Sequence, residues 1–200
     1  MPTLSAADFL RLVENNKTLV FFDLEATGLK GDYNSVICVS IKPYGEKPVT
    51  FMIDKAGKDK KVVEQARDML AKADAWVGYY SKGFDYPMIN TRLLKHELEP
   101  LQPKPHIDMY YTLRYHLNTA RRSQAHLLDW LEIAPTAEEL SDLGDGSKVV
   151  KKMSVGADEW NKILSGSEKA KKVMRDRCES DTIGLEALYR RTKHLIRDVR

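Results

Sequence analysis

Residues 21–29 read Phe21-Phe22-Asp23-Leu24-Glu25-Ala26-Thr27-Gly28-Leu29, an apolar run in which two acids are set. The run falls in a predicted buried strand over Thr18–Leu24, because aromatic and β-branched residues dominate it. Side chains two apart on a strand share a face, so we expect Asp23 and Glu25 to lie side by side. Such a pair repels and loses hydration, and a bound Mg²⁺ or Mn²⁺ relieves both costs. Taken alone, the tripeptide more often marks a strand end whose acids are solvated or paired with lysine.

The rest of the chain alternates between strand and helix patterns. Further strands are predicted at Ser35–Ile41, Val49–Ile53 and Trp76–Tyr79. Helices are predicted, with a capping signal at Ser5 and Asp8 for the first, over Ala6–Glu14, Val62–Ala73, Phe84–Leu94, Ile107–Leu117, Gln124–Leu131, Asp158–Leu164 and Glu168–Ile196. The glycine-containing segment Ser141–Lys148 predicts a loop. This order of elements predicts an α/β fold, a single domain over residues 1–200 with one mixed sheet flanked by helices.

Composition narrows the class of protein without naming a function. The 200 residues are 42% hydrophobic and 30% charged, as in ordinary globular domains. A net charge of +3 is too small to argue for nucleic-acid binding by itself. The two cysteines, Cys38 and Cys178, form no disulfide framework, and no segment has the length of a membrane span. We therefore expect a soluble protein of the reducing cytoplasm that does not bind membranes.

Two further acids, Asp85 and Asp181, lie at positions that indicate a specific role for a carboxylate. Asp85 follows the fourth predicted strand and begins a helix, a position that also suits an acid for dipole reasons alone. Asp181 keeps the three- and four-residue spacing of Cys178 and Leu185 on the last helix, so it shares their inward stripe. A carboxylate among core positions requires a partner, either a metal or a salt bridge to Arg177 one turn back.

These acids lie in segments that resemble a known family. Residues 23–29 closely resemble the first motif of DEDD 3′–5′ exonucleases, residues 80–85 are similar to the second, and residues 178–189 to the third. Within that superfamily the arrangement is similar to the YprB-like branch and to polymerase proofreading domains. The resemblance implies a ribonuclease-H-like fold and a 3′–5′ exonuclease that hydrolyses phosphodiester bonds at single-stranded DNA or RNA ends.

The resemblance also implies roles for individual residues. Two ions, Mg²⁺ or Mn²⁺, would be held by Asp23, Glu25, Asp85 and Asp181, with Asp23 shared between them. The motif residues expected to contact nucleic acid are Thr27, Gly28, Leu29 and Phe84.

The third motif departs from the family pattern at its base. Arg177 stands four residues before Asp181, where the family carries a tyrosine, and Asp176 stands where a histidine occurs in other members. Arginine stays protonated, so Arg177 cannot accept a proton from water. Two interpretations of this catalytic candidate stay open: a clamp on the scissile phosphate, or a damaged site. A tyrosine from elsewhere in the chain, such as Tyr79, Tyr80 or Tyr110, is a further candidate for the role of the missing tyrosine.

A polar break between two predicted helices carries Arg121 and Arg122, with Tyr110, Tyr111 and Tyr115 upstream. Arginine for phosphate and tyrosine for base stacking are what a single-strand channel needs, although a solvated face has the same composition. Two rival functions stay open beside the exonuclease: an endonuclease of the same fold, and a nucleic-acid-binding module without catalysis. The sequence does not separate DNA from RNA as the substrate.

Overall fold

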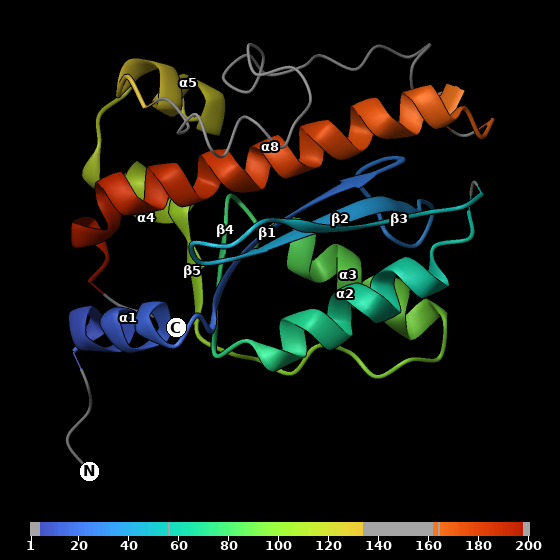
Figure 1. The fold of residues 1–200 in the computed structure, drawn as a ribbon, viewed down its shortest axis with the longest axis horizontal. Coiled ribbons are helices and arrows are strands. Elements are labelled where there is room, and N and C mark those ends of the chain that lie inside the picture. The colour runs from blue at the N-terminus through green and yellow to red at the C-terminus, as the bar shows by residue number, and fades with distance from the viewer. Residues whose placement is uncertain (1–4, 56, 134–161, 164, 198–200) are drawn as a thin grey trace.

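The computed structural model describes residues 5–55, 57–133, 162–163 and 165–197, and in this part of the chain a five-stranded mixed sheet is flanked by helices (Figure 1). The strands, in the spatial order β3-β2-β1-β4-β5, are β1 (Leu19–Ala26), β2 (Val36–Pro43), β3 (Val49–Met52), β4 (Ala75–Gly78) and β5 (His106–Asp108). The first three strands are antiparallel, whereas β4 and β5 run parallel to β1. The predicted α/β architecture is confirmed.

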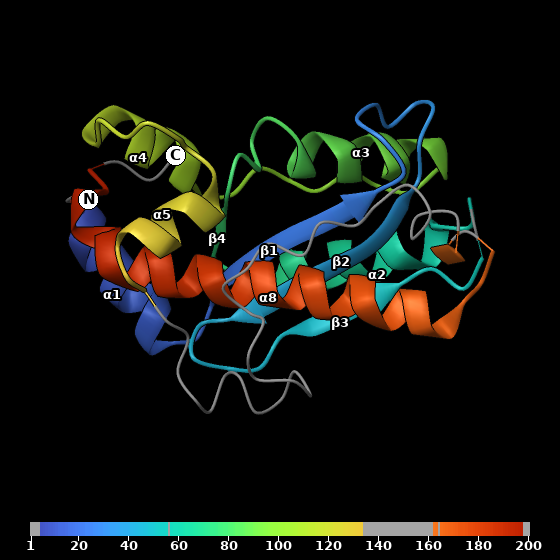
Figure 2. The ribbon, with the colours of Figure 1, turned by 90° about the horizontal axis from the view of Figure 1, so that it is seen from above.

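Helices cover both faces of the sheet. On one face lie α2 (Lys60–Lys72) and α3 (Asp85–Lys95), and on the other the 25-residue α8 (Glu168–Thr192) crosses β1, β2 and β3 (Figures 1 and 2). The remaining elements are α1 (Ala6–Asn15), α4 (Met109–His116), α5 (Gln124–Trp130), which packs on α8, and the 3₁₀ turn η1 (Lys193–Leu195). Within the described residues, each helix is too short or too polar to cross a membrane.

Strand β1 is packed on both faces, and its side chains alternate accordingly. Phe22 belongs to the core that α2 and α3 cover, whereas Phe21 packs edge-on against Tyr189 of α8, with ring centroids 5.4 Å apart. Because Asp23 and Glu25 continue the Phe21 series, they face α8 as the period of two predicts. The apolar half of this face ends where the acids begin.

One predicted helix was wrong at its start. The sequence predicted a helix from Ile107, but residues 106–108 form β5, which pairs in parallel with β4, and the helix begins at Met109. A three-residue strand is too short to show alternation, and only its neighbour in the sheet identifies it.

Most other predicted boundaries agree to within two residues. The last helix is shorter than predicted, because it ends at Thr192 and the 3₁₀ turn follows. The predicted loop Ser141–Lys148 and most of the predicted helix Asp158–Leu164 lie outside the described residues.

A buried ion cluster joins α2 and α3 to the loop that leads into β2. The carboxylate of Asp59 accepts hydrogen bonds from Arg92 Nε at 2.8 Å and Nη2 at 2.9 Å, and from the Val36 amide at 2.9 Å. Nε2 of His96 lies 2.7 Å from the same carboxylate, and Arg92 Nη1 donates to the Gly31 carbonyl at 3.0 Å. The loop between β1 and β2 is therefore anchored on α3, close to the two acids of β1.

Replacing Asp59 should destabilise the fold strongly. Asp59→Ala leaves Arg92, which is only 7% exposed, buried without the carboxylate that pairs with its guanidinium. We expect a loss of about 3–5 kcal/mol in the free energy of unfolding, measured by urea titration. Asp68→Ala removes an exposed acid from the same helix and should cost less than about 1 kcal/mol. Equal losses in the two variants would contradict a bracing role for Asp59.

Candidate active site

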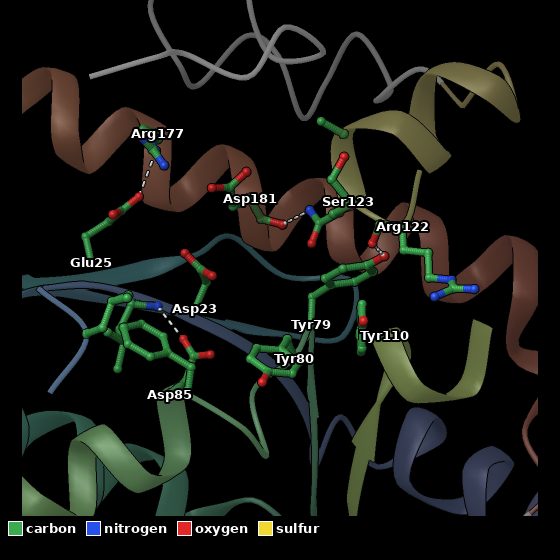
Figure 3. A pocket seen from close by; sticks show the side chains of 15 residues that line it. Asp23, Glu25, Tyr79, Tyr80, Asp85, Tyr110, Arg122, Ser123, Arg177 and Asp181 are labelled. Carbon is green, nitrogen blue, oxygen red and sulfur yellow. Dashed lines mark hydrogen bonds and ion pairs between the residues drawn. The ribbon is translucent and has the colours of Figure 1, made fainter. Parts of the chain in front are cut away.

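The four predicted acids line one cavity of about 520 Å³ (Figure 3). Asp23 and Glu25 come from β1 and Asp181 from α8, and one carboxylate oxygen from each lies within 4.8 Å of the others. Asp85 is the first residue of α3, and its Oδ1 accepts a hydrogen bond of 3.0 Å from the Leu24 amide. Residues separated by up to 158 positions thus meet at one edge of the sheet.

The long helix is fixed on β1 and β2 by neutral contacts beside the acids. The Cys178 thiol lies 3.5 Å from the Asp23 carbonyl oxygen and 3.6 Å from Asp23 Oδ2. One turn further, the buried hydroxyls of Ser40 and Thr182 are 3.0 Å apart. Because both contacts flank Asp181 in sequence, they hold its carboxylate over β1.

Burial and mutual repulsion shift the acids away from their ordinary behaviour. Loss of hydration raises the pKa of Asp23 well above its usual range, and the charges of Asp181, Asp85 and Glu25 raise it further. Burial also raises the pKa of Asp85 to about 7, although its hydrogen bond from the Leu24 amide opposes the change. Without added positive charge, this cluster is costly to ionise.

Arg177 brings one compensating charge into the cavity. Its Nε lies 2.7 Å from Glu25 Oε1, with the two side chains 17% and 12% exposed. The ion pair links α8 to β1 within the acidic cluster, because Glu25 is one of its carboxylates (Figure 3). It joins two elements that are distant in the sequence, so the one-turn spacing along α8 could not reveal it.

Tyrosines form the wall of the cavity opposite Arg177. The ring of Tyr110 packs edge-on against Tyr80 and Tyr79, with centroids 5.1 Å and 6.0 Å away. The Tyr79 hydroxyl donates to the carbonyl of Arg122, which lines the cavity, whereas the neighbouring Arg121 does not line it. Loss of hydration raises the pKa of Tyr79, so its phenol stays a protonated donor.

Two buried polar residues of β5 shape the loop that carries this wall. The Asp108 carboxylate accepts hydrogen bonds of 2.9 Å from the backbone amides of Tyr80 and Lys82. Nε2 of His106 lies 2.8 Å from the Ser81 hydroxyl, and burial lowers the pKa of this histidine to about 3. His106 is therefore neutral and, with Asp108, supports the loop. Asp108 is the last residue of β5, which pairs with β4. Because the sequence did not predict this strand, it did not place Asp108 beside the loop after β4.

The remaining predicted contact residues divide into two groups. Leu29 and Phe84 line the cavity. Thr27 and Gly28 belong to the turn beyond it, where the Thr27 hydroxyl lies 3.3 Å from Asn34 Oδ1. A Cβ on Gly28 would come within 2.5 Å of the same oxygen, so a side chain at this position would displace the Asn34 amide.

The donor set of the cavity fits a hard divalent cation. Carboxylate oxygens predominate, and they suit Mg²⁺ or Mn²⁺ better than thiophilic metals. A cation would also remove the repulsion that raises the pKa of Asp23. The cavity is therefore a possible acidic metal-binding site.

The mixed sheet, the helices on its two faces and the acidic cavity at one sheet edge have a ribonuclease-H-like architecture. The chain belongs to the RNase_H superfamily, whose family model matches residues 20–192. It is also similar to the uncharacterized protein YprB of Bacillus subtilis (strain 168), with 30% identity over 142 residues. The match covers 68% of this chain but 32% of YprB, so the chain spans about a third of that relative's length.

Solved structures show the same architecture at low identity. The family B DNA polymerase from the hyperthermophilic archaeon Pyrobaculum calidifontis superposes with a TM-score of 0.64 at 17% identity, over 88% of this chain and 24% of the polymerase chain. A structure described as the apo form of a nuclease gives a TM-score of 0.53 at 15% identity, over 96% of this chain and 79% of that chain. At these identities the likeness shows the fold, and the DEDD branch stays a prediction.

The raised pKa of Asp85 predicts how the metal-free protein responds to pH. In the unfolded chain Asp85 loses its proton near its ordinary value of 3.8, and in the folded chain near 7. The folded state thus binds more protons in this window, so its free energy of unfolding falls as pH rises from about 4 to 7.

Asp85→Asn should reduce that fall. In EDTA at pH 8 we expect this variant to be about 1–4 kcal/mol more stable than the wild type, with little difference near pH 4. Urea unfolding across this pH range measures both, and Asp32→Asn, at an exposed position, serves as the control. A difference that does not change with pH would argue against Asp85 as the titrating group.

Proposed function

We propose that the chain is a 3′–5′ exonuclease that hydrolyses phosphodiester bonds at single-stranded nucleic-acid ends. Asp23, Glu25, Asp85 and Asp181 would hold two Mg²⁺ or Mn²⁺ ions. The observation that carries the proposal is the convergence of these four carboxylates on one cavity of a ribonuclease-H-like fold. The resemblance of residues 23–29 to the first exonuclease motif supports the same reaction.

The chemistry follows from what the side chains can and cannot do. When bound, a pair of divalent cations activates a water and stabilises the leaving 3′ oxygen of an in-line displacement. Asp23 is the shared ligand in this proposal, because Asp181, Asp85 and Glu25 all act on its charge. Arg177 cannot take a proton from the water, but its guanidinium suits a phosphate that enters beside Glu25.

The wall of the cavity favours a single strand over a duplex. Tyr80 is 46% exposed and its ring meets Tyr110 at the cavity, so an unstacked base has an aromatic face to rest on. The edge of the cavity beside these tyrosines, its rim, is lined by Arg122, whose charge would attract the phosphate that follows. Bases within a duplex are stacked on each other and would have to separate to use these faces.

One observation favours a second candidate function, a nucleic-acid-binding module without catalysis. Arg177 stands where the third motif carries a tyrosine, and it forms an ion pair with Glu25, a proposed metal ligand. The gathering of four acids in one cavity opposes this candidate, because carboxylates held together without a use destabilise a fold. An endonuclease with the same metal site differs only in where it cuts.

The decisive assay uses 5′-labelled single-stranded DNA and RNA with Mn²⁺. We expect a ladder that shortens from the 3′ end, and Asp23→Asn should slow it by at least about a hundredfold, because the shared ligand is lost. Asp32→Asn changes an exposed acid in the same way and should retain the wild-type rate. Internal cuts would move the assignment to an endonuclease, and binding without cleavage would favour the module.

The two neighbouring arginines make a matched test of the rim. The measurement uses an Asp23→Asn background, so that the oligonucleotide is not cleaved. In this background Arg122→Ala should weaken oligonucleotide binding by about threefold to tenfold. The dependence of log affinity on log salt should flatten by about 0.7 for the lost phosphate contact. Arg121→Ala, outside the cavity, should change both less. Fluorescence anisotropy measures both, and equal effects of the two substitutions would contradict a phosphate path through this rim.

A further inference from the structure

Arg177 forms an ion pair with Glu25, a carboxylate that the proposed function assigns to a divalent cation. Its guanidinium reaches from α8 to Glu25 Oε1 at 2.7 Å, and both side chains are more than four-fifths buried. A carboxylate oxygen of this same Glu25 lies within 4.8 Å of those of Asp23 and Asp181. The ion pair is thus inside the acidic cluster (Figure 3).

The partners of two other acids differ from that of Glu25 in charge. Asp85 receives the backbone amide of Leu24, and Asp23 meets the thiol of Cys178. These partners are neutral, so a cation can bind the two aspartates without displacing a positive charge. A cation at Glu25 must come close to a guanidinium that keeps its proton at every physiological pH. Arg177 therefore cannot lose its charge by deprotonation, and a cation can bind Glu25 only if the Arg177 side chain moves away.

Resting on the proposed function, we propose that Arg177 is a positioning residue that gates the second cation. In the metal-free protein it holds Glu25 in place of a cation. The first divalent cation binds at the two aspartates with Arg177 still on Glu25. The second takes Glu25 only by displacing Arg177, which then projects its charge into the cavity that receives the phosphate. The second cation consequently binds more weakly than the acids alone would allow.

The test is a Mn²⁺ titration by isothermal calorimetry on the intact chain, without nucleic acid. Arg177→Met keeps the aliphatic stem and removes the charge, and we expect the weaker Mn²⁺ to bind roughly tenfold more tightly. Arg175→Met removes the same charge from an exposed position of α8 and should leave both affinities unchanged. Arg177→Gln replaces Arg177→Met if the methionine variant proves unstable.

A second background separates competition for Glu25 from general repulsion between cations. In Glu25→Gln, the carboxylate over which Arg177 and Mn²⁺ compete is gone. Adding Arg177→Met to Glu25→Gln should therefore change Mn²⁺ affinity less than twofold. A tenfold gain that persists in this background would mean simple repulsion and would overturn the gate.

The outcomes also distinguish the gate from the function on which it rests. Equal Mn²⁺ affinities in the wild type and Arg177→Met, with two ions bound in each, overturn the gate and leave the metal site intact. Absence of Mn²⁺ binding in the wild type and in both Arg177 variants overturns the metal site, and the gate with it. A tenfold gain confined to Arg177 variants that retain Glu25 supports the gate.

Discussion

Strand β1 must be buried on both faces, and it must also carry charge on one of them. Its alternation meets both demands: Phe22 faces α2 and α3, while Phe21 packs on Tyr189 of α8. The apolar series on the α8 face then changes to Asp23 and Glu25 where the helix is still overhead. Because α8 is continuous across this boundary, the same packing that buries the core also brings Asp181 to the acids. The alternation of side chains along β1 therefore places both the hydrophobic core and the acids of the site.

The acids lose hydration in this position, which makes their ionised forms less stable, and the surrounding contacts reduce this loss of stability only in part. Asp85 receives a backbone amide, Asp23 meets a thiol, and Glu25 has an arginine. Neutral donors of this kind stabilise a carboxylate only in part, and the pKa of Asp23 stays well above its usual range. A cluster optimised for stability alone would contain fewer acids or more cations. The surplus of carboxylate is what a divalent cation would use.

Local rules were enough to predict part of this arrangement. The common face of Asp23 and Glu25 follows from strand periodicity, and the inward position of Asp181 follows from helix periodicity. Strand β5 could not be predicted, because three residues show no period and its identity comes from pairing with β4. The contact between Arg177 and Glu25 depends on how α8 crosses the sheet, which no sequence spacing encodes. The same holds for Tyr79, whose hydroxyl reaches the carbonyl of Arg122 from another element.

The charge of the cavity sets a condition on any nucleic acid that enters it. Of the described residues that line it, four are carboxylic acids and two are arginines, although the whole chain has a net charge of +3. Ionised carboxylates would repel a phosphate that approaches them, whereas Arg122 and Arg177, which line the same cavity, would attract it. Cations bound in the acidic cluster would reverse that repulsion, so phosphate and cation would each favour the binding of the other. Weak electrostatic attraction by the whole protein is then compatible with strong attraction at the site, because the local charge is set by what the carboxylates hold.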